Sequence, residues 1–115
     1  MPEKTYFGEM TDENVSSIFR DAADFIRREL HCGEFTLYAY AIDGLVAAAY
    51  MSDYVLKPIS QQLRGETMEA LYQAACKGCV YNAVADPVED LNSVALKLVN
   101  GFCVVLFPGV GAVAY

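Results

Sequence analysis

Residues 98–115, LVNGFCVVLFPGVGAVAY, form the stretch that decides the fold. These 18 residues carry no charged side chain, and a run of this length would admit a membrane helix. However, Pro108 and Gly109 interrupt the run near its middle, and a Pro-Gly pair is typical of a turn. Residues 102–107 are rich in β-branched and aromatic side chains, and residues 112–115 resume the apolar run. We therefore expect a C-terminal β-hairpin.

A further strand, earlier in the chain, is expected at residues 34–42, EFTLYAYAI, where the side chains alternate between two faces. Both faces are largely apolar, which suits a strand covered by helices on both sides. The Asp43-Gly44 pair that follows is typical of a turn. Gly44 is the position at which we look for a backbone with positive φ.

Three helices are expected earlier in the chain or in its middle. The first begins at Thr11, a suitable N-cap, and runs to about residue 30. It has apolar residues every three or four positions, namely Val15, Ile18, Phe19, Ala22, Phe25, Ile26 and Leu30. Arg27 and Arg28 then lie near its negative C-terminal end. Residues 45–56 are expected to form a buried helix and residues 67–75 a short one, followed by a short strand at residues 79–85.

A fourth helix has the clearest local start signal. Asp86 can cap it, Pro87 suits the first helical position, and Glu89 stands where its side chain can bond back to the cap. The helix is expected to run to about Val99, and Gly101 supplies the C-terminal stop.

These elements predict one α/β (α+β) domain with a small mixed β-sheet of about three to four strands, about four helices packed on it and the C-terminal hairpin. Residues 1–10 are a lead-in segment and residues 11–115 form the domain. Because the last strand is cut short, we expect the chain to be a truncated piece of a longer protein.

The composition excludes two classes of protein. The 115 residues include 8 basic and 15 acidic side chains, which gives a net charge of −7, and 55% of the residues are hydrophobic. This is the reverse of the composition of disordered chains. An acidic chain with scattered basic residues also lacks the electrostatic footprint of a nucleic-acid-binding protein, so no nucleic acid is expected as a partner. Four cysteines are too few for a secreted disulfide framework, which favours reduced thiols.

The cysteines suggest two kinds of chemistry. Cys76-Lys77-Gly78-Cys79 is a C-x-x-C motif, but it follows a helix, whose carbonyl end opposes thiolate formation. With His31, Cys32 and Cys103 these thiols would supply enough ligands for zinc. However, His31 and Cys32 are adjacent and poorly placed to chelate one ion, and Cys103 lies in an expected strand.

The other candidate groups have simpler structural explanations. His31 fits a helix C-terminus. The carboxylate pairs Asp43 with Asp53 and Glu66 with Glu69 fit solvated faces, and residues 109–111, Gly-Val-Gly, fit a turn. We assign no catalytic, cofactor-binding or metal-binding residue. A small cytosolic α/β ligand-binding or thiol- or metal-dependent enzyme domain that uses His31 or the pair Cys76 and Cys79 stays open as an alternative.

Four short segments in order resemble a known family. Residues 40–46 (YAIDGLV) are similar to the Y-x-x-D-G-L-V strand end in the N-terminal domain of A subunits of the GerA spore-germination receptor family. Residues 24–30 (DFIRREL), 55–59 (VLKPI) and 98–107 (LVNGFCVVLF) resemble further segments of that domain. The chain departs from the pattern at Ala47 and Ala48, where the family has an acidic residue, and at the turn of residues 108–111.

The resemblance implies a non-enzymatic role in subunit interaction and signal transduction during spore germination. Such A subunits carry two α/β subdomains followed by transmembrane helices, and this chain would be the first subdomain. The implied partners are the B- and C-type receptor subunits and the rest of its own chain, with self-association left open. The implied location is the spore inner membrane, with this domain on the cytoplasmic (spore core) side. No family site residue is carried over.

Overall fold

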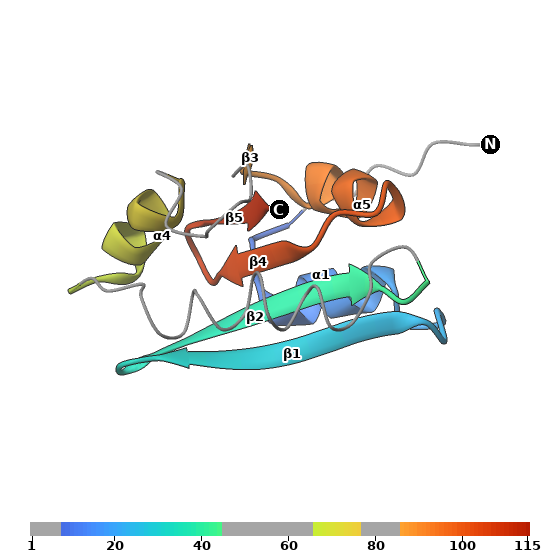
Figure 1. The fold of residues 1–115 in the computed structure, drawn as a ribbon, viewed down its shortest axis with the longest axis horizontal. Helices are drawn as coiled ribbons and strands as arrows, with labels where there is room; N and C mark the ends of the chain where they lie inside the picture. Colours follow the sequence, from blue (N-terminus) through green and yellow to red (C-terminus); the bar gives the residue numbers. More distant parts are fainter. Residues whose placement is uncertain (1–7, 45–65, 77–85) are drawn as a thin grey trace.

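The computed structural model describes residues 8–44, 66–76 and 86–115. Five strands form one sheet in the order β1-β2-β4-β5-β3, and every neighbouring pair is antiparallel (Figure 1). The strands are β1 (Phe25–Cys32), β2 (Phe35–Ile42), β3 (Asp86–Val88), β4 (Val104–Phe107) and β5 (Gly111–Ala114). The helices of the described residues are α1 (Asp12–Ile18), α4 (Met68–Cys76) and α5 (Leu91–Val99).

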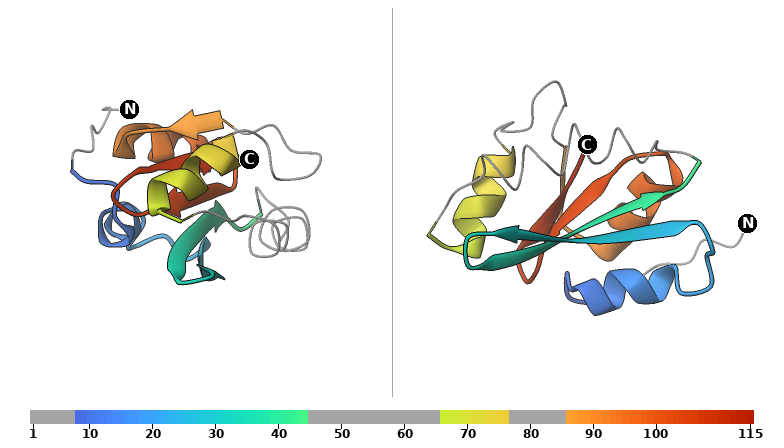
Figure 2. Two further views of the ribbon diagram at one scale, coloured as in Figure 1. Left: turned by 90° about the vertical axis from the view of Figure 1, so that its left-hand side faces the viewer. Right: turned by 60° about the horizontal axis from the view of Figure 1, so that its bottom comes forward.

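The sheet has an apolar cluster on each face because successive strand residues point to opposite sides. Leu37, Val105 and Val113 lie in one cluster with Leu71 and Tyr72 of α4. Tyr40 and Leu106 lie in the other, which includes side chains of α1 and α5. Figure 2 shows α4 apart from α1, which runs alongside the β1–β2 hairpin. The sheet is therefore the middle layer between α4 and the pair α1 and α5.

Several sequence predictions are confirmed. The chain has an α+β fold, β2 and α4 lie where they were expected, and β4 and β5 form the C-terminal hairpin. Gly44 has a φ of +89°, the conformation that glycine adopts without steric cost. The helix before the hairpin ends at Val99, followed by Gly101 with a φ of +88°. The expected helix at residues 45–56 and the expected strand at residues 79–85 lie outside the described residues.

The prediction of a long first helix is wrong. It begins as predicted, with the Thr11 side chain accepting a hydrogen bond from the Asn14 backbone N–H, but α1 ends at Ile18. Phe25–Cys32 is instead strand β1, which pairs with β2 along its whole length. The apolar spacing of this segment fits both a helix and an alternating strand. The hairpin decides between them, because it supplies β1 with a complete row of backbone hydrogen-bond partners.

The predicted cap at Asp86 is also wrong. Asp86–Val88 is strand β3, which pairs with β5, and the helix is capped four residues later by Asp90, whose carboxylate accepts a hydrogen bond from Ser93 N at 2.7 Å. Pro87 is tolerated because β3 is an edge strand. The backbone pairing of β3 with β5 is a long-range interaction, and it outweighs the local signal for a helix cap at Asp86.

Candidate functional site

A cluster of polar side chains joins α1 to the β1–β2 hairpin. The Arg27 guanidinium of β1 donates to both carboxylate oxygens of Asp12, with Nε 2.8 Å from Oδ1 and Nη2 2.5 Å from Oδ2. The Tyr40 hydroxyl of β2 donates to Asp12 Oδ1 at 2.7 Å, and the Ser16 hydroxyl donates to the same oxygen at 3.3 Å. The guanidinium also lies 4.8 Å from the centre of the Tyr38 ring.

The electrostatics of this cluster favour a structural role. The hydrogen bonds from Arg27 hold the pKa of the Asp12 carboxyl below its usual value, and this effect outweighs the opposing effect of burial. Burial and the hydrogen bond to Asp12 raise the pKa of Tyr40 far above its usual range. Asp12 is thus an ionised carboxylate that accepts hydrogen bonds from Arg27, Tyr40 and Ser16, and Tyr40 is a neutral donor, which is an arrangement that fixes α1 to the sheet.

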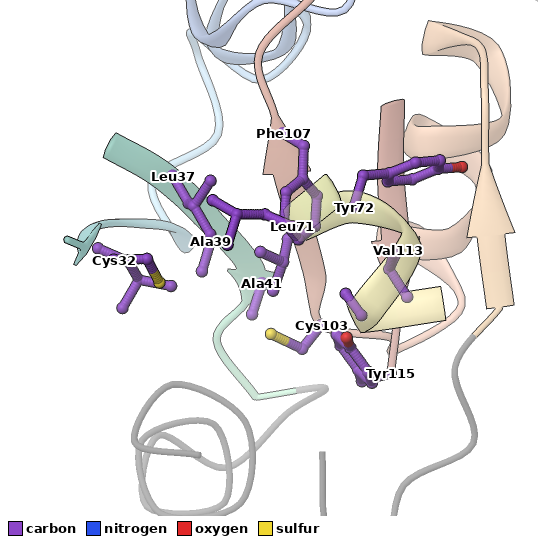
Figure 3. Packing of buried hydrophobic residues seen from close by; sticks show 13 residues of the cluster. Cys32, Leu37, Ala39, Ala41, Leu71, Tyr72, Cys103, Phe107, Val113 and Tyr115 are labelled. Carbon is purple, nitrogen blue, oxygen red and sulfur yellow. The ribbon is translucent and has the colours of Figure 1, made fainter. Parts of the chain in front are cut away.

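The three described cysteines lie in buried or half-buried surroundings. Cys32 and Cys103 are buried among the apolar side chains of the α4 face, as Figure 3 shows. Burial raises the pKa of the Cys103 thiol to about 12. Cys76, at the end of α4, is half-buried, and burial is also the main cause that raises its pKa. A nucleophilic cysteine needs a lowered pKa, so the thiols of Cys76 and Cys103 have the opposite of the required electrostatics.

The structure does not bring His31, Cys32, Cys76 and Cys103, the described candidates for zinc ligation, into one site. His31 and Cys32 are neighbours on a strand, so their side chains point to opposite faces of the sheet. Within the three described segments, no group of three His, Cys, Asp or Glu side chains could hold a metal ion. Cys79, the second residue of the C-x-x-C motif, lies outside the described residues.

His31 lies on the exposed side of β1 and not at a helix end, so that prediction is wrong. Its imidazole side chain is 69% exposed, with Nε2 3.8 Å from Glu29 Oε2 and Nδ1 3.5 Å from the Thr36 hydroxyl. An imidazole in this position is in contact with solvent, and Glu29, which lies beside it, is exposed as well. Neither residue is enclosed in a way that would orient a substrate.

The remaining candidates also lie on the surface or in turns. Asp43, Glu66 and Glu69 are exposed, and Asp53 lies outside the described residues. Gly109 is in the β4–β5 turn, where its backbone N–H donates to the Met10 carbonyl at 2.8 Å. This donor therefore serves the fold and is not directed at a phosphate group.

Two surface features were missed by the sequence analysis. The first is the exposed edge formed by β1, where Arg27, Glu29 and His31 lie on one face of the sheet and Arg28 on the other. The prediction of a helix concealed it, although the inward-facing Leu30 and Cys32 between exposed residues were a signal for a strand. The second is the outer side of α5, where Leu96 is 60% and Val99 56% exposed. Because they are three positions apart, they form a small apolar patch.

Comparisons with known proteins complete the description. No protein-family model matches the chain, and no curated protein matches it. The chain is similar to the crystal structure of the N-terminal domain of the A subunit of the Bacillus megaterium spore germinant receptor GerK3, with a TM-score of 0.67 and 14% sequence identity. The match covers 96% of this chain and 48% of that one, so this chain spans about half the length of its structural relative.

The comparison confirms the sequence resemblance at the level of the fold. Within residues 8–44, 66–76 and 86–115, no helix is both long enough and apolar enough to cross a membrane. The chain has the fold of an N-terminal domain of a spore germinant receptor A subunit.

Proposed function

We propose that the chain is a non-enzymatic module of a spore germinant receptor A subunit, which acts by contact with other receptor subunits and relays the nutrient signal. The observation that carries the proposal is the structural match over 96% of the chain to a domain of such a receptor. The similarity of the sequence motifs to the same receptor family supports it independently.

The chemistry of the described residues is consistent with a role in contact and not in catalysis. The charged group with the most strongly organised surroundings, Asp12, has its oxygens bound by Arg27, Tyr40 and Ser16. The thiols of Cys76 and Cys103 have raised pKa values. In the receptor, the module would lie on the cytoplasmic side of the spore inner membrane, anchored through the rest of its polypeptide and in contact with B- and C-type subunits.

Deletion of the gene in the spore-forming host tests this proposal. Spores without the protein are expected to respond at least about tenfold more slowly to one or more nutrients in a panel of amino acids and sugars. Their response to a cationic surfactant, which permeabilises the membrane without a receptor, is expected to be unchanged. Wild-type germination rates with every nutrient would overturn the proposal, and so would an equal loss of the surfactant response.

A further inference from the structure

The two edges of the sheet are unequal. The β3 edge is three residues long and contains Pro87, which has no backbone N–H to offer another strand. The β1 edge is eight residues long, and in Figure 1 β1 runs along the lower side of the molecule with no described element beyond it. Long edge strands expose a row of backbone donors and acceptors that can pair with another strand.

The hydrogen-bond register identifies which backbone groups of β1 point outward. Asp43 N donates to Asp24 O at 2.8 Å, so these two residues form a hydrogen-bonded pair of the hairpin. Such pairs alternate along antiparallel strands, and the residues between them direct their N–H and C=O to the other side. Arg27, Glu29 and His31 therefore direct these groups away from β2. Among the described residues, no backbone group bonds to them.

We propose that two copies of this chain pair through their β1 strands, antiparallel and about a two-fold axis at Arg28. In this register the outward backbone groups of Arg27 meet those of Glu29 in the second copy, and by symmetry the reverse pair also forms. Both pairs place opposite charges side by side, which stabilises neighbouring strands. Ile26 lies opposite Leu30 of the second copy on the other face, so the apolar cluster beside α4 would continue across the junction.

The side chains that the pairing uses are accessible. The Arg27 side chain is 41% exposed even though Asp12 binds its Nε and Nη2 atoms, which leaves Nη1 for a second acceptor. The Glu29 side chain is 49% exposed, and its contact with His31 is long, with Oε2 3.8 Å from Nε2. The fixed Arg27 and the accessible Glu29 are thus available to each other across the two-fold axis.

The two registers whose axis lies one residue away, and which preserve the backbone pairing, are less favourable. A shift of the axis to residue 27 places Arg27 opposite Arg27, and a shift to residue 29 places Glu29 opposite Glu29. Both place like charges in direct opposition and lose both Arg27–Glu29 pairs. The charge pattern of β1 therefore favours the register centred on Arg28 over these two.

This register has one unfavourable pair, because Arg28 lies opposite its own copy on the axis. Arg28 is exposed, and like charges at this spacing weaken strand pairing. The pairing is thus expected to be reversible, and the Arg28→Thr substitution should tighten it. If the β1 edge did not associate, the Arg28→Thr substitution would cause no increase in dimer formation.

Sedimentation velocity of the 115-residue chain across a wide range of concentrations tests the pairing. The wild type is expected to show a concentration-dependent monomer–dimer equilibrium, and Glu29→Arg should weaken the dimer at least about tenfold because it turns both attractive pairs repulsive. Glu34→Arg makes the same charge change in the exposed β1–β2 turn and is the matched control. Circular dichroism establishes that each variant is folded. A monomeric wild type, or equal effects of the two substitutions, would overturn the proposal.

A crosslink tests the register separately. Arg28→Cys places two thiols opposite each other on the axis, at a spacing that permits a disulfide. Mild oxidation is expected to give a dimer whose linked peptides, identified by mass spectrometry, both contain position 28. Glu13→Cys on the exposed side of α1 is the control and should give no such dimer. Links only through the native cysteines would contradict this register. Self-pairing is independent of the receptor proposal, because it is measured without spores.

Discussion

The face of the sheet covered by α4 and the face covered by α1 and α5 are stabilised by different interactions. On the α4 face the described contacts are apolar and close, as between the rings of Tyr72 and Phe107, which meet edge to face at 5.6 Å. The other face also has an apolar centre, but at its margin Asp12 is bound by Arg27 and Tyr40. Apolar packing therefore stabilises the α4 face, whereas apolar packing and an ion pair together stabilise the face covered by α1 and α5.

The largest loss of stability is expected when one buried leucine is truncated in the apolar cluster on each face of the sheet. Leu71 of α4 is 1% exposed and Leu98 of α5 is fully buried. Leu71→Ala and Leu98→Ala should each lower the free energy of unfolding by about 2–5 kcal/mol, because each removes apolar contacts and leaves a cavity. Urea denaturation at neutral pH measures both. A loss below about 1 kcal/mol at either site would show that the corresponding helix is not part of the core.

A smaller effect, confined to the α4 face, is expected from Gly111→Ala. A Cβ atom at Gly111 would lie 2.9 Å from Cζ of the Tyr72 ring, which is closer than packed carbon atoms approach. Because the ring also packs against Phe107, it cannot easily move, and we expect a loss of about 1–3 kcal/mol. The added cost of Gly111→Ala should shrink in a Tyr72→Leu background. Equal costs in the two backgrounds would contradict the contact.

The smallest effect is expected from Asp12→Asn, and it should depend on pH. Part of the ion pair is in contact with solvent, so its loss should cost only about 1 kcal/mol at pH 7. The folded-state pKa of Asp12 is lowered, so the contribution is complete above the unfolded value of 3.8 and is lost as the pH falls through the folded value. The stability difference between wild type and Asp12→Asn should therefore vanish in acid.

The comparison between the faces supplies the control for this prediction. The cost of Leu71→Ala should be the same at pH 7 and in acid, because Tyr72 and Cys103, the titratable groups of that cluster with raised pKa values, stay protonated throughout this range. A pH-independent cost of Asp12→Asn would show that charge does not stabilise the α1 face, and the distinction between the two faces would fail.

The sequence predicted elements whose local signals agreed with their tertiary surroundings. Alternation located β2, and the Pro-Gly pair located the C-terminal hairpin. Prediction failed where one segment satisfied two patterns. Phe25, Ile26 and Leu30 fit both helical and strand spacing, and both Asp86 and Asp90 could cap a helix. In each case the choice came from strand pairing with a distant segment, which local patterns do not contain.

The candidate site was harder to predict for the same reason. Asp12 lies 15 residues from Arg27 and 28 from Tyr40, so no short motif links the three. The exposed edge formed by β1 could be recognised only after the predicted helix over residues 11–30 was corrected to a shorter helix and a strand. By contrast, the alternative that uses His31 and the cysteines followed from residue type alone, and in the structure His31 is exposed whereas Cys32 and Cys103 are buried.

The proposed function requires that the chain contacts other subunits of a germinant receptor. Its most direct test is chemical crosslinking in intact spores, followed by isolation of the full-length protein and identification of the linked chains by mass spectrometry. We expect B- and C-type receptor subunits to be crosslinked to the full-length protein. Recovery of the protein with neither subunit, from spores in which both are present, would contradict the account.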